Sequence, residues 1–162
     1  MIDYEFRVFS PKLIDQSITQ TNWVLAKNLL IKRNSIENHI KIFKKNKINK
    51  IFICSIPFEK KKNIYLNYNF LLNYKKSLKI DKELILPINL NKKTYDFTIN
   101  FILKKLKHID GVEIPCNSFD KGPFNSLSKL PNIISGLKRI IKKKRNIKIF
   151  FFPKSMIKKH RE

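Results

Sequence analysis

The most abundant reactive group in this sequence is the lysine ammonium. Lys and Arg number 35 against 12 Asp and Glu, which gives 162 residues a formal net charge of +23 at pH 7. Such a chain repels itself unless a polyanion neutralises it, so nucleic acid or an anionic membrane is the expected partner. Lys greatly outnumbers Arg. Contacts with phosphates are therefore favoured over readout of base edges, for which the bidentate guanidinium is better suited.

The basic residues are spread through the chain, and some of them form short runs. Three lysines stand together at 60–62, two more at 75–76, and four basic residues at 142–145. Closely spaced ammonium groups neutralise phosphates and release their counterions. We therefore expect RNA binding by these runs, which comprise Lys60, Lys61, Lys62, Lys75, Lys76, Lys142, Lys143, Lys144 and Arg145. The tyrosines between the first two runs are expected to pack on a sheet, with base stacking as the alternative.

Residue types that serve catalysis or metal binding are scattered instead of clustered. No Gly-rich phosphate loop occurs, and neither cysteine has a partner at metal-ligand spacing, so we predict no enzyme activity, no metal site and no cofactor. The cysteines are expected to be free reduced thiols, because no Cys-x-x-Cys pair or secretory signal accompanies them. The residues excluded in this way are His39, His108, His160, Cys54 and Cys116.

The lysine runs must be held by a folded framework, which begins at the N-terminus. Tyr4, Phe6 and Val8 alternate with charged residues, the period of a half-buried strand. Ser10 and Pro11 suit the cap and the first position of a helix. Apolar residues then follow at near-helical spacing, namely Leu13, Ile14, Ile18, Leu25 and Leu29. A strand, a tight turn and a helix are predicted here.

The next elements suggest a fold class. Patterns predict a strand over 51–58, a long basic hairpin over 59–80, a strand over 84–90, a helix over 95–106 and a strand over 112–114. The insertion at 32–49 either extends the first helix or forms a second short one. This order predicts an α+β, ferredoxin-like βαββαβ fold over residues 1–114, with an antiparallel sheet and both helices on one face.

Residues 115–162 are predicted to be a basic C-terminal extension. Prolines and Gly122 mark a linker, a basic helix is indicated over 133–141, and a short strand over 147–152. From Lys129 onward the only acidic residue is Glu162. We expect such a segment to become ordered against a polyanion.

Several segments resemble the small-subunit ribosomal protein ten family. The segment 9–16 is similar to the end of the family's first strand and its Leu-Ile-Asp-Gln motif. The matching residues are Phe9, Lys12, Leu13, Ile14, Asp15 and Gln16, whereas Ser10 and Pro11 replace the family's Asp-His. Further similar segments follow in the family's order: 55–58 with 60–62, 64–66, 75–77, 93–96 and 103–114. The family's Ser-Pro-His and Arg-Thr-His motifs are missing.

The resemblance implies a structural constituent of the ribosomal small subunit. Such a protein would bind rRNA in the subunit head beside small-subunit proteins three, nine and fourteen, with the hairpin inserted into RNA. Lys12, at the family's basic position, joins the candidate RNA-binding residues on this ground. Divergence from the family pattern, the extensions and the Lys-, Ile- and Asn-rich composition, typical of an AT-rich genome, favour a mitochondrial ribosome, with a plastid or a bacterial cytoplasm as alternatives.

Two other classes of function remain open. A free-standing RNA-binding protein is one alternative, because ferredoxin-like sheets also build the RNA-recognition motif, but the Gly-aromatic strand of that motif is missing. A peripheral membrane protein is suggested by the mixture of Lys with Ile and Phe over 137–152. No apolar run approaches the ~20 residues needed to span a bilayer, so no membrane span is expected.

Overall fold

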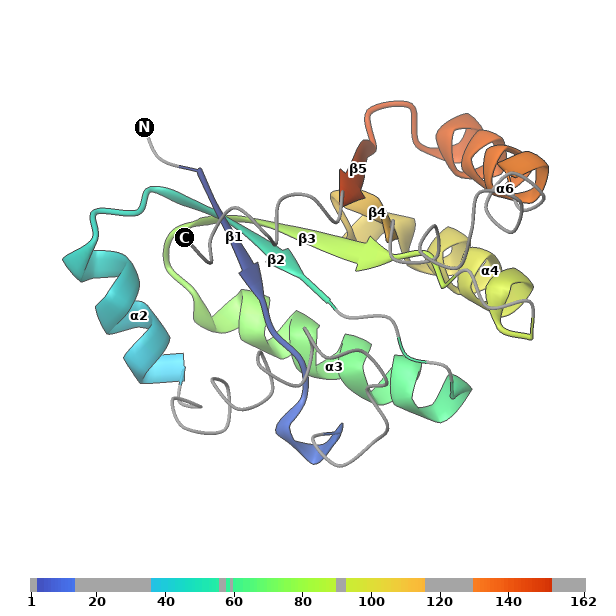
Figure 1. Ribbon diagram of the computed structural model, residues 1–162. Coiled ribbons are helices and arrows are strands. Elements are labelled where there is room, and N and C mark those ends of the chain that lie inside the picture. Colours follow the sequence, from blue (N-terminus) through green and yellow to red (C-terminus); the bar gives the residue numbers. More distant parts are fainter. Residues whose placement is uncertain are drawn as a thin grey trace, which may run out of the picture. The chain divides into compact units, whose positions relative to one another are not determined.

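The structure is a computed structural model that describes residues 3–13, 36–55, 58, 60–89, 93–115 and 130–152 (Figure 1). The chain divides into two compact units, Met1–Leu84 and Ile85–Glu162. The strands of the sheet follow the chain order, β1-β2-β3-β4-β5.

In the first unit, two parallel strands are followed by helices. Strand β1 (Asp3–Arg7) pairs in parallel with β2 (Lys50–Cys54), in a register that places Tyr4 opposite Ile51. A 3-10 turn, η1 (Pro11–Leu13), and helix α2 (Ile36–Lys45) lie between them in the chain. The predicted first strand is therefore confirmed, and α2 shows that the 32–49 insertion contains a helix. The predicted helix beyond Leu13 falls on residues outside the described ranges.

The predicted basic hairpin is wrong, because residues 61–77 form helix α3 (Lys61–Ser77). Its buried side chains recur at helical spacing and include Asn63, Asn67, Leu71 and Tyr74. Residues 60–80 also contain no Gly or Pro that a tight hairpin turn would favour. The β-prone aromatics of this segment are therefore accommodated in a helix, because strand propensity depends strongly on context.

The second unit also contains only parallel strand pairs among its described residues. Strand β3 (Asp81–Pro87), which begins in the first unit, pairs with β4 (Gly111–Pro115), and β4 pairs with β5 (Lys148–Phe152). Helix α4 (Tyr95–Lys105) and the 3-10 turn η2 (Leu106–His108) connect β3 to β4. Helix α6 (Leu130–Lys143) precedes β5. The strands and helices predicted for these segments are confirmed.

The antiparallel ferredoxin-like fold is therefore wrong. Antiparallel neighbours can be joined by a hairpin, whereas parallel neighbours need a crossover connection, usually a helix. Because α3 replaces the hairpin, β2 and β3 are joined by such a crossover, and α4 and α6 do the same for the following strands. The units divide between Leu84 and Ile85, whereas the sequence suggested a boundary after 114. Strand β5 pairs in parallel with β4.

Among the described residues, no helix has the length and apolar character needed to cross a membrane.

Candidate nucleic-acid interface

Helix α6 separates a buried apolar side from an exposed basic side. Ile133 and Ile140 are 3% and 0% exposed, and Gly136 lies between them against α4. A Cβ at Gly136 would lie 2.8 Å from Ile99 Cδ1, so the absence of a side chain allows the two helices to approach closely. The Tyr95 hydroxyl donates a hydrogen bond to the Asn132 carbonyl and fixes the start of α6 on α4.

The exposed side of α6 and the turn after it carry the cations that we call the α6 basic surface, namely Lys138, Lys142, Lys143 and Arg145. Lys138 and Lys142 are four residues apart, so their side chains are neighbours on the helix surface. No acidic residue occurs anywhere in 130–152. Within this segment, then, no carboxylate competes with a phosphate for these cations. The arrangement can bind several adjacent phosphates without reading base edges.

Two cations beside this surface contribute to packing. Arg139 Nη2 donates to Asn100 Oδ1 at 2.9 Å and connects α6 to α4. Lys144 Nζ donates to the carbonyl oxygens of Leu106 and Ile109 at 3.1 and 2.6 Å. Lys144 was one of the predicted RNA-binding residues, but the structure directs its ammonium group to the protein backbone. The remaining residues of that run, Lys142, Lys143 and Arg145, are exposed together.

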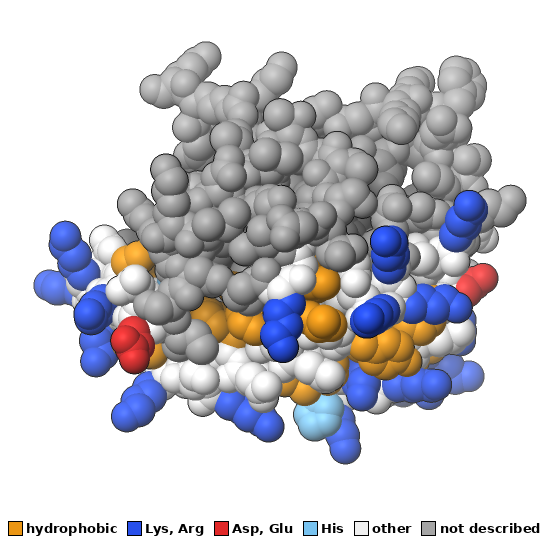
Figure 2. Space-filling view, turned by 90° about the horizontal axis from the view of Figure 1, so that it is seen from below, with side chains coloured by type: hydrophobic (Ala, Val, Ile, Leu, Met, Phe, Trp, Pro, Cys, Tyr) orange, Lys and Arg blue, Asp and Glu red, His pale blue; other side chains and the backbone are white. Residues whose placement is uncertain are grey.

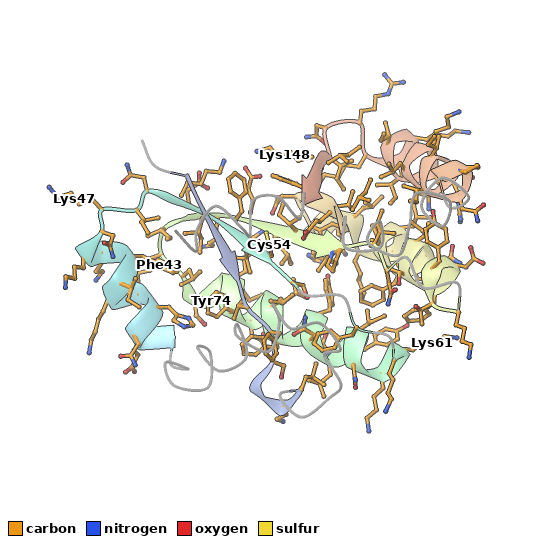
Figure 3. All side chains as sticks on the ribbon, viewed as in Figure 1. Phe43, Lys47, Cys54, Lys61, Tyr74 and Lys148 are labelled. Atoms are coloured by element: carbon orange, nitrogen blue, oxygen red, sulfur yellow. The ribbon has the colours of Figure 1, made fainter. Side chains whose placement is uncertain are left out.

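The lysines predicted on the hairpin lie at opposite ends of α3. Lys60 precedes the helix and Lys61 and Lys62 begin it (Lys61 is labelled in Figure 3), whereas Lys75 and Lys76 are in its last turn. A rise of 1.5 Å per residue separates the two groups by about 20 Å. Lys75 is half-buried, and the other four are exposed. The structure therefore does not bring the two groups together as a hairpin tip would.

Lys12, the remaining candidate, is exposed in the short η1 turn. Its described neighbours in that turn are Pro11 and the buried Leu13, so no basic cluster surrounds it within η1.

Sequence reasoning missed a basic surface on α2. Lys41, Lys44 and Lys45 are exposed on this helix and Lys47 directly after it, while His39 and Phe43 are buried. The helical spacing of Ile36, Ile40 and Phe43 contained the signal, because it places the intervening lysines on the opposite side. Figure 2 shows Lys and Arg side chains distributed over the displayed face, with few acidic side chains among them. Exposed cations are therefore not confined to α6.

Buried polar side chains at the carboxyl ends of β1 and β2 form a second cluster. Asn67 Oδ1 accepts a hydrogen bond from the Ser10 backbone N–H at 2.8 Å, and Asn67 Nδ2 donates to Ser55 Oγ at 2.6 Å. All three residues are 3% exposed. Asn67 thus satisfies polar groups at the ends of both strands, which is a structural role.

Ionisable groups in the described residues do not assemble a metal centre. No group of three or more His, Cys, Asp or Glu side chains that could hold a metal ion occurs there. Burial raises the pKa of the Tyr95 hydroxyl, and the nearby Asp96 carboxylate raises it further. Tyr95 therefore stays protonated at neutral pH and acts as a hydrogen-bond donor to α6.

Comparison with known proteins adds no relative: no family model, curated protein or solved structure matches the chain.

Proposed function

We propose that this protein binds RNA through its phosphate backbone, with the α6 basic surface as a principal contact. The observation that supports the proposal is the exposure of Lys138, Lys142, Lys143 and Arg145 in a segment without acidic residues. The net charge of +23 supplies long-range attraction for a polyanion. Because the cations are mainly lysines, the expected binding depends strongly on salt and weakly on RNA sequence.

A membrane surface is less well supported as the partner of α6. Helices that lie in a membrane interface insert a broad apolar face into the lipid. The apolar side of α6, with Ile133 and Ile140, is already buried in the protein. Ile134 and Ile141 are 42% and 38% exposed and border the basic surface. Replacing both by Ser should leave RNA affinity unchanged, whereas it should weaken binding to phosphatidylserine vesicles if lipid were the partner.

The assignment to the ribosomal small subunit remains a prediction from resemblance. Its structural premise, a hairpin that enters RNA, is replaced by α3. Phosphate binding by the α6 basic surface requires only exposed cations and an RNA strand, so rRNA is among its targets.

The test is the salt dependence of binding to a single-stranded RNA, measured by fluorescence anisotropy. The α6 triple variant Lys138→Gln/Lys142→Gln/Lys143→Gln is compared with the α3 triple variant Lys60→Gln/Lys61→Gln/Lys62→Gln. Both remove three positive charges, so a loss of general attraction affects them equally. We expect the α6 variant to lower the slope of log K against log salt by about 2, from ~0.7 per lost phosphate contact, and the α3 variant to lower it less.

Two results would contradict the α6 basic surface as a principal contact. One is an unchanged slope in the α6 variant with its circular dichroism intact. The other is an equal fall in both variants, which would indicate diffuse attraction instead of a defined interface. Failure of the wild type to bind RNA below 50 mM salt would reject RNA binding altogether.

A further inference from the structure

A buried histidine lies at the contact between α2 and α3 in the first unit. His39 is 3% exposed, and its Nδ1 lies 2.9 Å from the hydroxyl oxygen of Tyr74, which is 1% exposed. The two rings meet edge to face, with centroids 5.8 Å apart at 69°. Phe43, one turn along α2, has its ring centroid 6.5 Å from that of His39. Figure 3 labels Phe43 on α2 and Tyr74 on α3.

This hydrogen bond depends on the protonation state of the imidazole. A neutral ring can accept a hydrogen bond from the Tyr74 hydroxyl through Nδ1, whereas an imidazolium has two N–H donors and no acceptor. An imidazolium among aromatic rings would also be a charge removed from water. Protonation therefore weakens the contact both by loss of the acceptor and by the cost of burying charge. Burial accordingly lowers the pKa of His39.

Among the described residues, the groups around His39 do not favour the charged form of its imidazole. From α3, the titratable group that faces it is Tyr74, whose pKa is raised by burial, so its hydroxyl carries no negative charge at neutral or acidic pH. The nearest charged residues of α2 in the chain, Glu37 and Lys41, are exposed. Lys75, next to Tyr74 on α3, is a half-buried cation.

We propose that the His39–Tyr74 contact is a pH-sensitive latch, and that protonation of His39 releases α2 from α3. The released element would carry Lys41, Lys44, Lys45 and Lys47, which are exposed on α2 and directly after it. This latch is independent of the RNA interface proposed for α6, because it uses only residues of the first unit. It goes beyond RNA binding in assigning a conformational response to acidification.

The direction of the response follows from proton linkage. Released His39 has the ordinary pKa near 6.5, and packed His39 has a lower one. Between these values the released state binds more protons, so the released population rises as pH falls below 6.5, by up to about tenfold per pH unit. Above that pH the latch is closed and insensitive to pH.

Hydrogen–deuterium exchange tests the latch in the full chain. Amide exchange of α2 is measured at pH 7.5 and 5.5, corrected for intrinsic rates, with α4 as the internal reference. We expect the protection of α2 relative to α4 to fall by up to about tenfold in the wild type. The variant His39→Phe/Tyr74→Phe keeps the aromatic volume, removes both polar partners and should show no such fall. His108→Gln, a substitution of an exposed histidine, should behave as the wild type.

Three outcomes would overturn the proposal: constant α2 protection in the wild type, an equal fall in the double variant, or suppression of the fall by His108→Gln. If the double variant fails to fold, NMR titration of the wild-type imidazoles decides. A His39 resonance that titrates below 6.5 together with the α2 amides supports the latch. A resonance that titrates at or above 6.5, or without change in the α2 amides, rejects it.

Discussion

The ammonium group of Lys144 donates a hydrogen bond to the carbonyl oxygen of Ile109 at 2.6 Å. The same group reaches the carbonyl of Leu106 at 3.1 Å, so it serves two backbone acceptors, one in the first residue of η2 and one directly after η2. Carbonyls at a helix end lack intrahelical partners, and a nearby lysine can satisfy them. One of the four consecutive basic residues at 142–145 is therefore committed to the fold, while its neighbour Lys143 is exposed.

This difference predicts that substitutions at two adjacent positions affect different properties, one the stability of the fold and the other RNA binding. Lys144→Met should lower the free energy of unfolding by about 1–3 kcal/mol, because it leaves part-buried carbonyls without a charged donor. Lys143→Met should change it by less than about 0.5 kcal/mol but weaken RNA binding. Urea denaturation and anisotropy on both variants measure the two effects. A loss of less than about 0.5 kcal/mol in Lys144→Met would show that its two hydrogen bonds do not stabilise the fold.

A second prediction concerns the ribosome. In lysate from cells that make the protein, we expect it to sediment with RNA at low salt and to move to the top of a sucrose gradient at high salt, because phosphate contacts weaken as salt rises. Mass spectrometry of the fractions detects it. Retention with the small-subunit rRNA at high salt would contradict this expectation and support a ribosomal constituent, as the resemblance implied.

The sequence predicted α4 well because three of its four buried side chains are apolar, the fourth being Thr98. Ile99, Ile102 and Leu106 recur at helical spacing and are all buried. Helix α3 was missed because its buried side includes Asn63 and Asn67, which look like surface residues in a sequence. The buried Asn67 side chain accepts a hydrogen bond from the backbone N–H of Ser10, which is 57 residues away in the chain. A local sequence pattern cannot indicate such a distant partner.

That one error determined the wrong fold. With 61–77 interpreted as a hairpin, β2 and β3 had to be antiparallel, and the segment beyond 114 was left without a place in the sheet. Once α3 is recognised, each strand is joined to the next by a segment that contains a helix, and a parallel sheet follows.

The candidate interface was only partly predictable, again because some of its contacts are distant in the sequence. The exposure of Lys138 and Lys142 follows from the period of α6, which places them opposite Gly136 and Ile140, but the acceptors of Lys144 lie 35 and 38 residues away.

The Asn67 network provides a third prediction. Asn67→Ala should lower the free energy of unfolding by about 2–4 kcal/mol, because it leaves the buried Ser10 N–H and Ser55 hydroxyl without their described partner. Asn69→Ala is the matched control, since Asn69 is exposed on the same helix. It should be neutral or slightly stabilising, as Ala has the higher helix propensity. Comparable destabilisation by both, measured by thermal denaturation, would mean that the network contributes little.

The packing of α6 on α4 gives a fourth prediction, which a double-mutant cycle can resolve. Gly136→Ala gains up to about 1 kcal/mol of helix propensity, yet the new methyl group would press on the Tyr95 hydroxyl and on Ile99 Cδ1. Overpacking of this kind costs about 1–3 kcal/mol, so we expect net destabilisation by roughly 1 kcal/mol.

Tyr95→Phe removes the hydroxyl and its hydrogen bond to Asn132, and by itself should also destabilise. In that background Gly136→Ala should cost less than in the wild type, because one of the two steric conflicts is gone while the gain in helix propensity remains. Urea denaturation of the four proteins gives the coupling energy, which we expect to exceed about 0.5 kcal/mol in favour of the double variant. If the changes in the free energy of unfolding were strictly additive, α6 could shift away from α4 without loss of stability. In that case the close approach at Gly136 would not hold the α6 basic surface in place.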